Sequence, residues 1–116
     1  MLNIGSDTKI YLCSGSTDMR KGINGLSILA QSILSEGACS GAMFVFRGKR
    51  SDRLKLLWWD GQGFCLFYKC LDSGKFIWPK SDDKESIGVT RGQLSMLMEG
   101  IDWRNPKWSS PPIYTG

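Results

Sequence analysis

Hydrophobic and polar positions first alternate along the chain and then recur at helical spacing. Residues 9–13 alternate and predict a short strand, which ends at the turn cluster of residues 14–16. Thr17 or Asp18 can cap a following helix, and Gly37 and the Ser40-Gly41 pair end it. Apolar residues at spacings of three and four predict one buried stripe on this helix: Met19, Ile23, Leu26, Ala30 and Ile33.

Between residues 42 and 78 the pattern changes to short apolar runs separated by turn signals. These runs predict four consecutive strands, at 42–47, 53–60, 63–70 and 75–78. The segment Asp60-Gly61-Gln62-Gly63 is typical of a tight hairpin turn, and the polar residues 80–85 are typical of a loop. Adjacent strands joined by short turns form an antiparallel meander.

The lengths of the two central loops predict the register of this meander. A two-residue turn at 61–62 pairs Trp59 with Phe64 and Lys55 with Tyr68, whereas a five-residue loop at 48–52 pairs Arg47 with Arg53. One face of the sheet is then almost wholly apolar and is expected to pack under the helices. Its members are Phe44, Phe46, Leu54, Leu56, Trp58, Cys65 and Phe67.

The opposite face of the predicted sheet is apolar in the middle and basic at one end. Arg47, Arg53 and Lys55 are its basic residues, and Met43 and Val45 belong to the apolar part. Such a face is too apolar for free solvent, so we expect the C-terminal region, a second subunit or a functional partner to cover it. The remaining members form the candidate interface: Leu57, Trp59, Phe64, Leu66 and Tyr68.

A second, shorter helix is predicted after residue 90. Thr90 and Gln93 fit a capping box, and apolar residues continue at helical spacing until the helix ends near Gly100. The Trp- and Pro-containing residues 105–116 predict an extended tail. The expected architecture is therefore one α+β domain over residues 1–116, with its core at about 9–104, an antiparallel sheet of four to five strands and two helices.

The positive charge of the chain is concentrated in one hairpin. The chain has 15 Lys and Arg against 11 Asp and Glu, a formal net charge of +4. The segment 47–55 accounts for this excess, with five basic residues against one acid, Asp52. We call the five basic residues the basic hairpin: Arg47, Lys49, Arg50, Arg53 and Lys55. Basic residues on a protruding loop suit phosphate oxygens, and neighbouring aromatic rings can stack on unpaired bases. Basic hairpin tips also serve simply as solubilising edges, and paired tryptophans commonly belong to a core or an interface.

The residue types of catalytic and metal sites are scarce. The chain has no histidine, so a zinc site would need all four of its widely spaced cysteines, and we expect no metal and no cofactor. We interpret the cysteines as small buried side chains in a reducing cytoplasm: Cys13, Cys39, Cys65 and Cys70. No signal peptide or membrane-spanning run is present, so no membrane partner is expected.

The acidic residues are scattered along the chain, which argues against an enzyme. Phosphoryl transfer by bound metals needs several carboxylates that converge from rigid elements. Asp60 fits a hairpin turn and Asp18 a helix cap, and the glycines form no nucleotide-binding motif. We therefore expect a protein without catalytic activity.

Several long motifs make the chain resemble a known family. They are 17–22 (TDMRKG), 44–48 (FVFRG), 52–63 (DRLKLLWWDGQG), 74–79 (GKFIWP), 93–97 (QLSML) and 99–103 (EGIDW). Over residues 9–104 the chain is similar to the TnpB accessory protein, the second open reading frame, of the IS-sixty-six group of bacterial insertion sequences. This family is distinct from the longer RNA-guided nuclease that shares the TnpB name.

The resemblance implies a role in the transposition of a mobile element in the bacterial cytoplasm, beside a larger transposase that cleaves and joins the strands. It carries over no catalytic residues. Two functions remain open. The protein binds DNA at the element ends through the basic hairpin, or it is an adaptor that docks to the transposase or self-associates as a homo-oligomer through the candidate interface.

Overall fold

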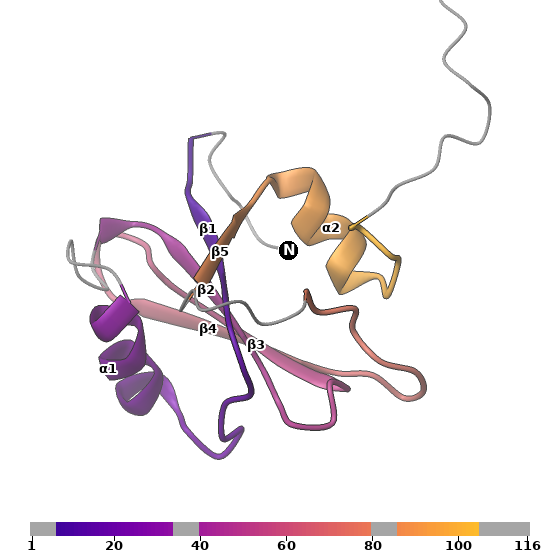
Figure 1. Ribbon diagram of the computed structural model, residues 1–116. Helices are drawn as coiled ribbons and strands as arrows, with labels where there is room; N and C mark the ends of the chain where they lie inside the picture. The colour runs from indigo at the N-terminus through magenta and orange to yellow at the C-terminus, as the bar shows by residue number, and fades with distance from the viewer. Residues whose placement is uncertain (1–6, 34–39, 80–85, 105–116) are drawn as a thin grey trace, which may run out of the picture.

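A five-stranded sheet with one helix against each face forms the body of the protein (Figure 1). The computed structural model describes residues 7–33, 40–79 and 86–104. The elements are β1 (Ile10–Cys13), α1 (Ile23–Ile33), β2 (Met43–Arg47), β3 (Arg53–Trp59), β4 (Phe64–Cys70), β5 (Ser86–Val89) and α2 (Arg91–Met98). The predicted α+β class is confirmed. Among these helices, none is long and apolar enough to cross a membrane.

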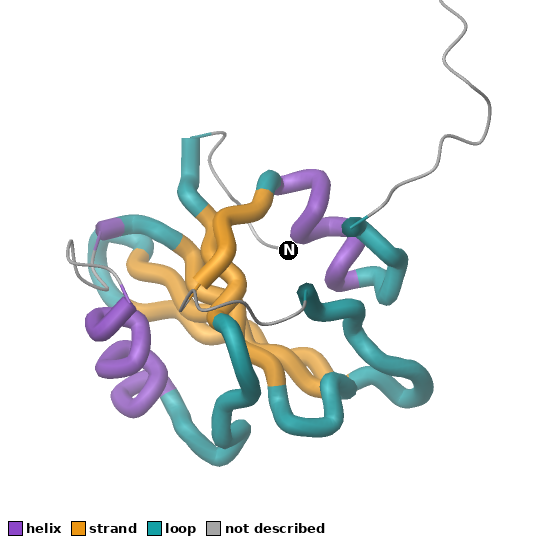
Figure 2. Tube along the Cα trace, viewed as in Figure 1, coloured by secondary structure: helices purple, strands orange, loops and turns teal. Residues whose placement is uncertain are grey.

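The sheet is mixed and not antiparallel throughout. Its strand order is β4-β3-β2-β1-β5, and Figure 2 shows the strands as one central block. The meander of β2, β3 and β4 is antiparallel as predicted, but β1 pairs with β2 in parallel and with β5 in antiparallel orientation. The parallel pair arises because α1 carries the chain from the end of β1 back to the start of β2.

The predicted strand at 75–78 is wrong, and the fifth strand lies further along the chain. The backbone N–H of Phe76 donates to Ser51 O at 2.7 Å, and Trp78 Nε1 donates to Cys13 O at 3.1 Å. These residues therefore cross an end of the sheet and bury their side chains without pairing as a strand. The edge position beside β1 belongs to β5, which the periodicity did not reveal.

The register is confirmed in one hairpin and wrong by one residue in the other. Trp59 pairs with Phe64 and Lys55 with Tyr68, as the two-residue turn predicts. Arg47, however, pairs with Leu54, because Gly48 N still donates to Arg53 O at 3.0 Å and belongs to the ladder. The loop has four residues, and Ser51 adopts a left-handed φ of 63° within it.

This shift by one residue turns β2 over relative to the predicted faces, because neighbouring side chains of a strand point to opposite sides. One core lies between the sheet and α2, with Met43, Val45, Leu54 and Leu56 among its members. The other lies between the sheet and α1, and its buried residues are Cys13, Leu26, Ala30, Ala42, Phe44, Phe46 and Leu57. The prediction that both helices pack on one face is therefore wrong.

The two helices differ in how well their starts were predicted. Thr90 caps α2 in the predicted capping box, with Gln93 N–H donating to its hydroxyl and Gln93 Oε1 accepting from its backbone N–H. The first helix begins at Ile23 and not after residues 17–18, because Asp18 accepts from the backbone and guanidinium of Arg20. The predicted helix end at residue 37, the loop at 80–85 and the tail at 105–116 lie outside the described residues.

Candidate nucleic-acid interface

The tip of the basic hairpin is exposed to solvent. Lys49 and Arg50 occupy the loop between β2 and β3, and both side chains are exposed. Arg53 follows at the start of β3 and is also exposed. Its Nη1 donates to the hydroxyl of Tyr68 at 3.3 Å, which holds the guanidinium on the α1 side of the sheet. These three cations are available to phosphate oxygens.

A segment distant in sequence, residues 17–22, packs against this hairpin. Thr17 N donates to Arg47 O at 2.8 Å, which aligns the segment with the end of β2. Gly48 permits the close approach, because a Cβ at this position would lie 2.8 Å from Met19 Cγ. Where the two segments meet they form a pocket of about 390 Å³, which is lined by Thr17, Asp18, Met19, Gly48, Lys49, Arg50, Asp52 and Arg53.

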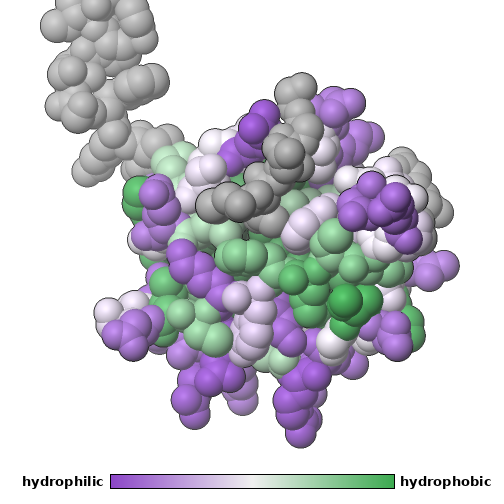
Figure 3. Space-filling model, turned by 180° about the vertical axis from the view of Figure 1, so that it is seen from behind, coloured by the Kyte–Doolittle hydropathy of each residue, from purple (hydrophilic) through white to green (hydrophobic). Residues whose placement is uncertain are grey.

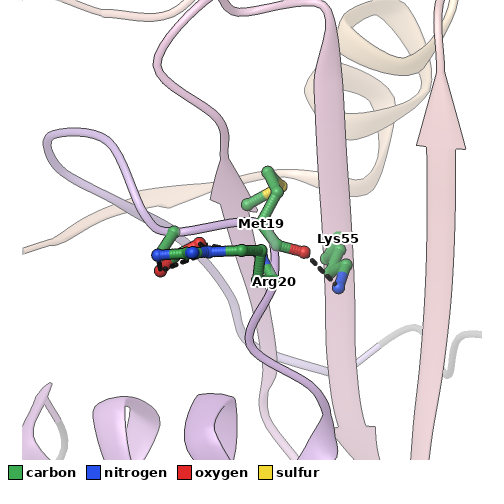
Figure 4. Close-up of polar contacts among 4 residues, drawn as sticks. Met19, Arg20 and Lys55 are labelled. Atoms are coloured by element: carbon green, nitrogen blue, oxygen red, sulfur yellow. Dashed lines mark hydrogen bonds and ion pairs between the residues drawn. The ribbon is translucent and has the colours of Figure 1, made fainter.

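Lys55, which the sequence places in the basic hairpin, lies inside the protein. Only 7% of it is exposed, and its Nζ donates to Met19 O (Figure 4) and to Lys21 O, both at 2.8 Å. The same ammonium lies 4.6 Å from the centre of the Tyr68 ring. The charge of Lys55 therefore binds the segment 17–22 to β3 and is not presented at the surface.

Arg47 lies on the other face of the sheet, away from the exposed cations. Its guanidinium lies 5.8 Å from the centre of the Trp78 ring, and Nη1 donates to Ser51 Oγ at 3.2 Å. The half-buried Arg47 thus supports the loop from beneath, whereas Lys49, Arg50 and Arg53 point outwards. The structure brings three of the five predicted cations together at the surface and directs the other two inwards.

The structure adds two cations that the charge count along the chain did not single out. Arg20 and Lys21 are exposed on the segment beside the hairpin. Arg20 forms an ion pair with Asp18 at 2.9 Å, and hydrogen bonds from Arg20 lower the pKa of Asp18 to about 2. In the sequence, the motif 17–22 was the signal that could have identified Arg20 and Lys21. We call the five exposed cations the basic end: Arg20, Lys21, Lys49, Arg50 and Arg53.

The candidate interface is more covered than the sequence implied. Leu57 is fully buried under α1, and Trp59, Phe64 and Leu66 are half-buried. The Trp59 and Phe64 rings meet edge to face with centres 5.0 Å apart, at the end of β3 opposite to the basic end. Only Tyr68, 43% exposed, joins the basic end. Seen from behind, apolar side chains still form a band across the surface (Figure 3).

Asp60 and the cysteines are titratable side chains outside the basic end, and their surroundings are those of structural residues. Asp60 accepts from the backbone N–H groups of Gln62 and Gly63, and these hydrogen bonds lower its pKa, as expected for a turn residue. Burial raises the pKa of the Cys13 thiol to about 12. Cys65 is half-buried and Cys70 is exposed, contrary to our interpretation of all cysteines as buried. Within the described ranges, no three His, Cys, Asp or Glu side chains gather as metal ligands.

Comparison with known proteins identifies relatives over the whole fold. The family described as IS66 Orf2 like protein matches residues 8–108. The uncharacterized protein y4hO of Sinorhizobium fredii is 41% identical over 116 residues, which cover 100% of both chains. The uncharacterized protein y4jC of the same organism is 38% identical over 107 residues, which cover 92% of this chain and 91% of y4jC. No solved structure matches the chain.

Proposed function

This chain belongs to the IS66 Orf2-like family, and we propose that, as an accessory protein of transposition, it contacts DNA through its basic end. The observation that carries this proposal is the joining of two segments distant in sequence, 17–22 and 48–53, into one surface with five exposed cations. Phosphate contacts of this kind position a protein on DNA without reading its sequence.

The scaffold beneath this surface supports the proposal. Lys55 and the close contact between Gly48 and Met19 fix the distance between the two segments. The backbone positions of the cations are thereby fixed relative to one another, so that less conformational entropy is lost when the two segments bind phosphates together. We further propose that the protein has no catalytic activity of its own and that the larger transposase of the element carries out strand cleavage and joining.

A salt-titrated binding assay tests the DNA contact. With four or five phosphates neutralised, the logarithm of the association constant should fall against the logarithm of salt concentration with a slope of about −4. Replacing Lys49, Arg50 and Arg53 together by Ala should weaken binding and flatten the slope by about 3. Comparison of element-end DNA with scrambled DNA separates sequence-specific from general phosphate binding.

A control variant removes the same charge from the other end of the sheet and from the segment beyond α2. Lys9 and Arg91 flank the ends of β1 and β5 opposite to the hairpin, and Arg104 lies beyond α2; all three are exposed. Their joint replacement by Ala should leave the slope within about one unit of the parent value. Equal slopes for the two triple variants would contradict a localised DNA contact.

The second candidate function is an adaptor that docks to the transposase. Two observations favour it: the apolar band on the surface in Figure 3 and the partial exposure of the candidate-interface residues Trp59, Phe64 and Leu66. A co-purification with the transposase distinguishes the two. An adaptor should retain the transposase after nuclease treatment and in the Lys49, Arg50 and Arg53 triple variant. If the two proteins associate only through DNA, the transposase should be lost both after nuclease treatment and in the triple variant.

A further inference from the structure

The outer edge of β4 is the longest strand edge in the described part of the protein without a backbone partner. β4 has seven residues and pairs with β3 without interruption from Trp59–Phe64 to Arg53–Cys70. The opposite edge of the sheet, β5, has only four residues. Natural proteins protect long, regular edges with charge, proline or a bulge. Within β4 the one charged side chain is Lys69, whose Nζ donates to Met98 O at 2.7 Å and lies over the sheet.

Two backbone hydrogen bonds reveal which groups of β4 point outwards. Asp60 N donates to Gly63 O at 3.1 Å, and Leu71 N donates to Asp52 O at 2.7 Å. Hydrogen-bonded pairs recur at every second residue of an antiparallel ladder, so the odd-numbered residues of β4 face β3. The N–H and C=O groups that point outwards therefore belong to Phe64, Leu66, Tyr68 and Cys70.

We propose that a second copy of this chain pairs with β4 in antiparallel orientation, about a two-fold axis at Phe67. In this register Leu66 lies opposite Tyr68 of the second copy, and Phe64 lies opposite Cys70. The outward groups of all these residues then form hydrogen bonds, whereas a shift of the axis to residue 66 or 68 leaves some of them beyond the paired region. The two five-stranded sheets become one continuous sheet.

The distribution of side chains favours a second copy as the occupant. Lys69 lies opposite Cys65, so the pairing opposes no like charges, and the half-buried Leu66 gains an aromatic neighbour. The antiparallel arrangement also keeps the two basic hairpins at opposite ends.

Measurement of the molar mass of the free protein over a concentration series tests this proposal without DNA. The parent chain should be a dimer that dissociates on dilution. Leu66→Pro removes an N–H that no described residue accepts, and proline is tolerated at such edge positions, so this variant should be monomeric with an unchanged circular dichroism spectrum. A parent chain that is monomeric at every concentration, or a dimeric Leu66→Pro variant, would overturn the proposal.

Cysteine crosslinking tests the register and decides the question if Leu66→Pro does not fold. In a background with Cys39, Cys65 and Cys70 replaced by Ser, Phe67→Cys places two thiols in a non-hydrogen-bonded pair on the two-fold axis. The Cα atoms of such a pair are about 4.5 Å apart, within the range of a disulfide. Phe67→Cys should form a reducible covalent dimer, and the matched Leu66→Cys variant should not. Equal crosslinking of both variants, or of neither, would contradict this register.

The proposal is independent of DNA contact and can fail separately from it. A dimer with a flat salt slope would retain the β4 pairing and refute the DNA contact. A monomer that binds DNA with the expected slope would support the DNA contact and refute the β4 pairing.

Discussion

The two hairpins of the meander share strand β3 but are closed by different means. At the β3–β4 turn, Asp60 accepts from the backbone of Gln62 and Gly63 at 2.9 Å, and Gly61 supplies a φ of +100°. All of these residues lie within the turn. At the β2–β3 turn, Ser51 N donates to Gly48 O and Arg47 Nη1 donates to Ser51 Oγ within the hairpin. Further contacts come from residues 17–22 and from Phe76, which are distant in sequence. One hairpin is closed by local contacts, and the other by local and tertiary contacts together.

Removal of the buried ammonium should break the tertiary hairpin most severely. Lys55→Met leaves Met19 O and Lys21 O without their donor, and we expect a loss of about 3 kcal/mol in the free energy of unfolding, measured by urea denaturation. Lys69→Met is the matched control, because its Nζ donates to one carbonyl, that of Met98, and its loss should be about 1 kcal/mol. Equal losses would mean that the segment 17–22 is held by other contacts.

A methyl group added to each hairpin should give the next largest contrast. Gly48→Ala brings a Cβ to 2.8 Å from Met19 Cγ, whereas the Cβ of Gly63→Ala meets no atom within 4 Å. We expect about 2 kcal/mol of destabilisation for the first variant and less than about 0.5 kcal/mol for the second, by thermal or urea unfolding. Weaker DNA binding should accompany Gly48→Ala only. Similar stabilities would show that Met19 moves aside without cost.

The smallest expected effect concerns pH. Hydrogen bonds from Arg20 hold the pKa of Asp18 at about 2, below the usual 3.8. Because the pKa is lowered in the folded state, the contribution of Asp18 to stability is complete above about pH 4 and is lost as the pH falls towards 2. Asp18→Asn should therefore flatten the acid limb of a stability–pH profile, and Asp60→Asn should affect the same limb through the turn. An unchanged acid limb in Asp18→Asn would contradict the assigned pKa.

The same contrast explains what the sequence could predict. The Asp60–Gly63 turn and the Thr90–Gln93 capping box depend on neighbours within a few residues, and both were predicted correctly. The β2–β3 register was missed by one residue, because Gly48 still belongs to the ladder through its hydrogen bond to Arg53 O. The space that Gly48 leaves for Met19 is a tertiary contact that neighbouring residues do not reveal. No local signal distinguishes a four-residue from a five-residue loop here.

The candidate site divides in the same way. Lys49, Arg50 and Arg53 were placed at an exposed tip by alternation and loop position, and the structure has them exposed. The burial of Lys55 could not be inferred, because its partners are backbone carbonyls 34 and 36 residues away. Whether the exposed cations bind DNA stays a prediction that the salt titration tests.

The central position of β1 has a consequence for folding. β2, β3 and β4 are contiguous in sequence, so their pairing closes only short loops and can form early. Ile10 of β1 pairs with Met43, 33 residues away, on one side and with Val89, 79 residues away, on the other. During synthesis β1 leaves the ribosome first, yet one of its edges stays unpaired until residue 89 has been added. We expect this late closure to be the slow step and its precursor to be the species most prone to aggregation.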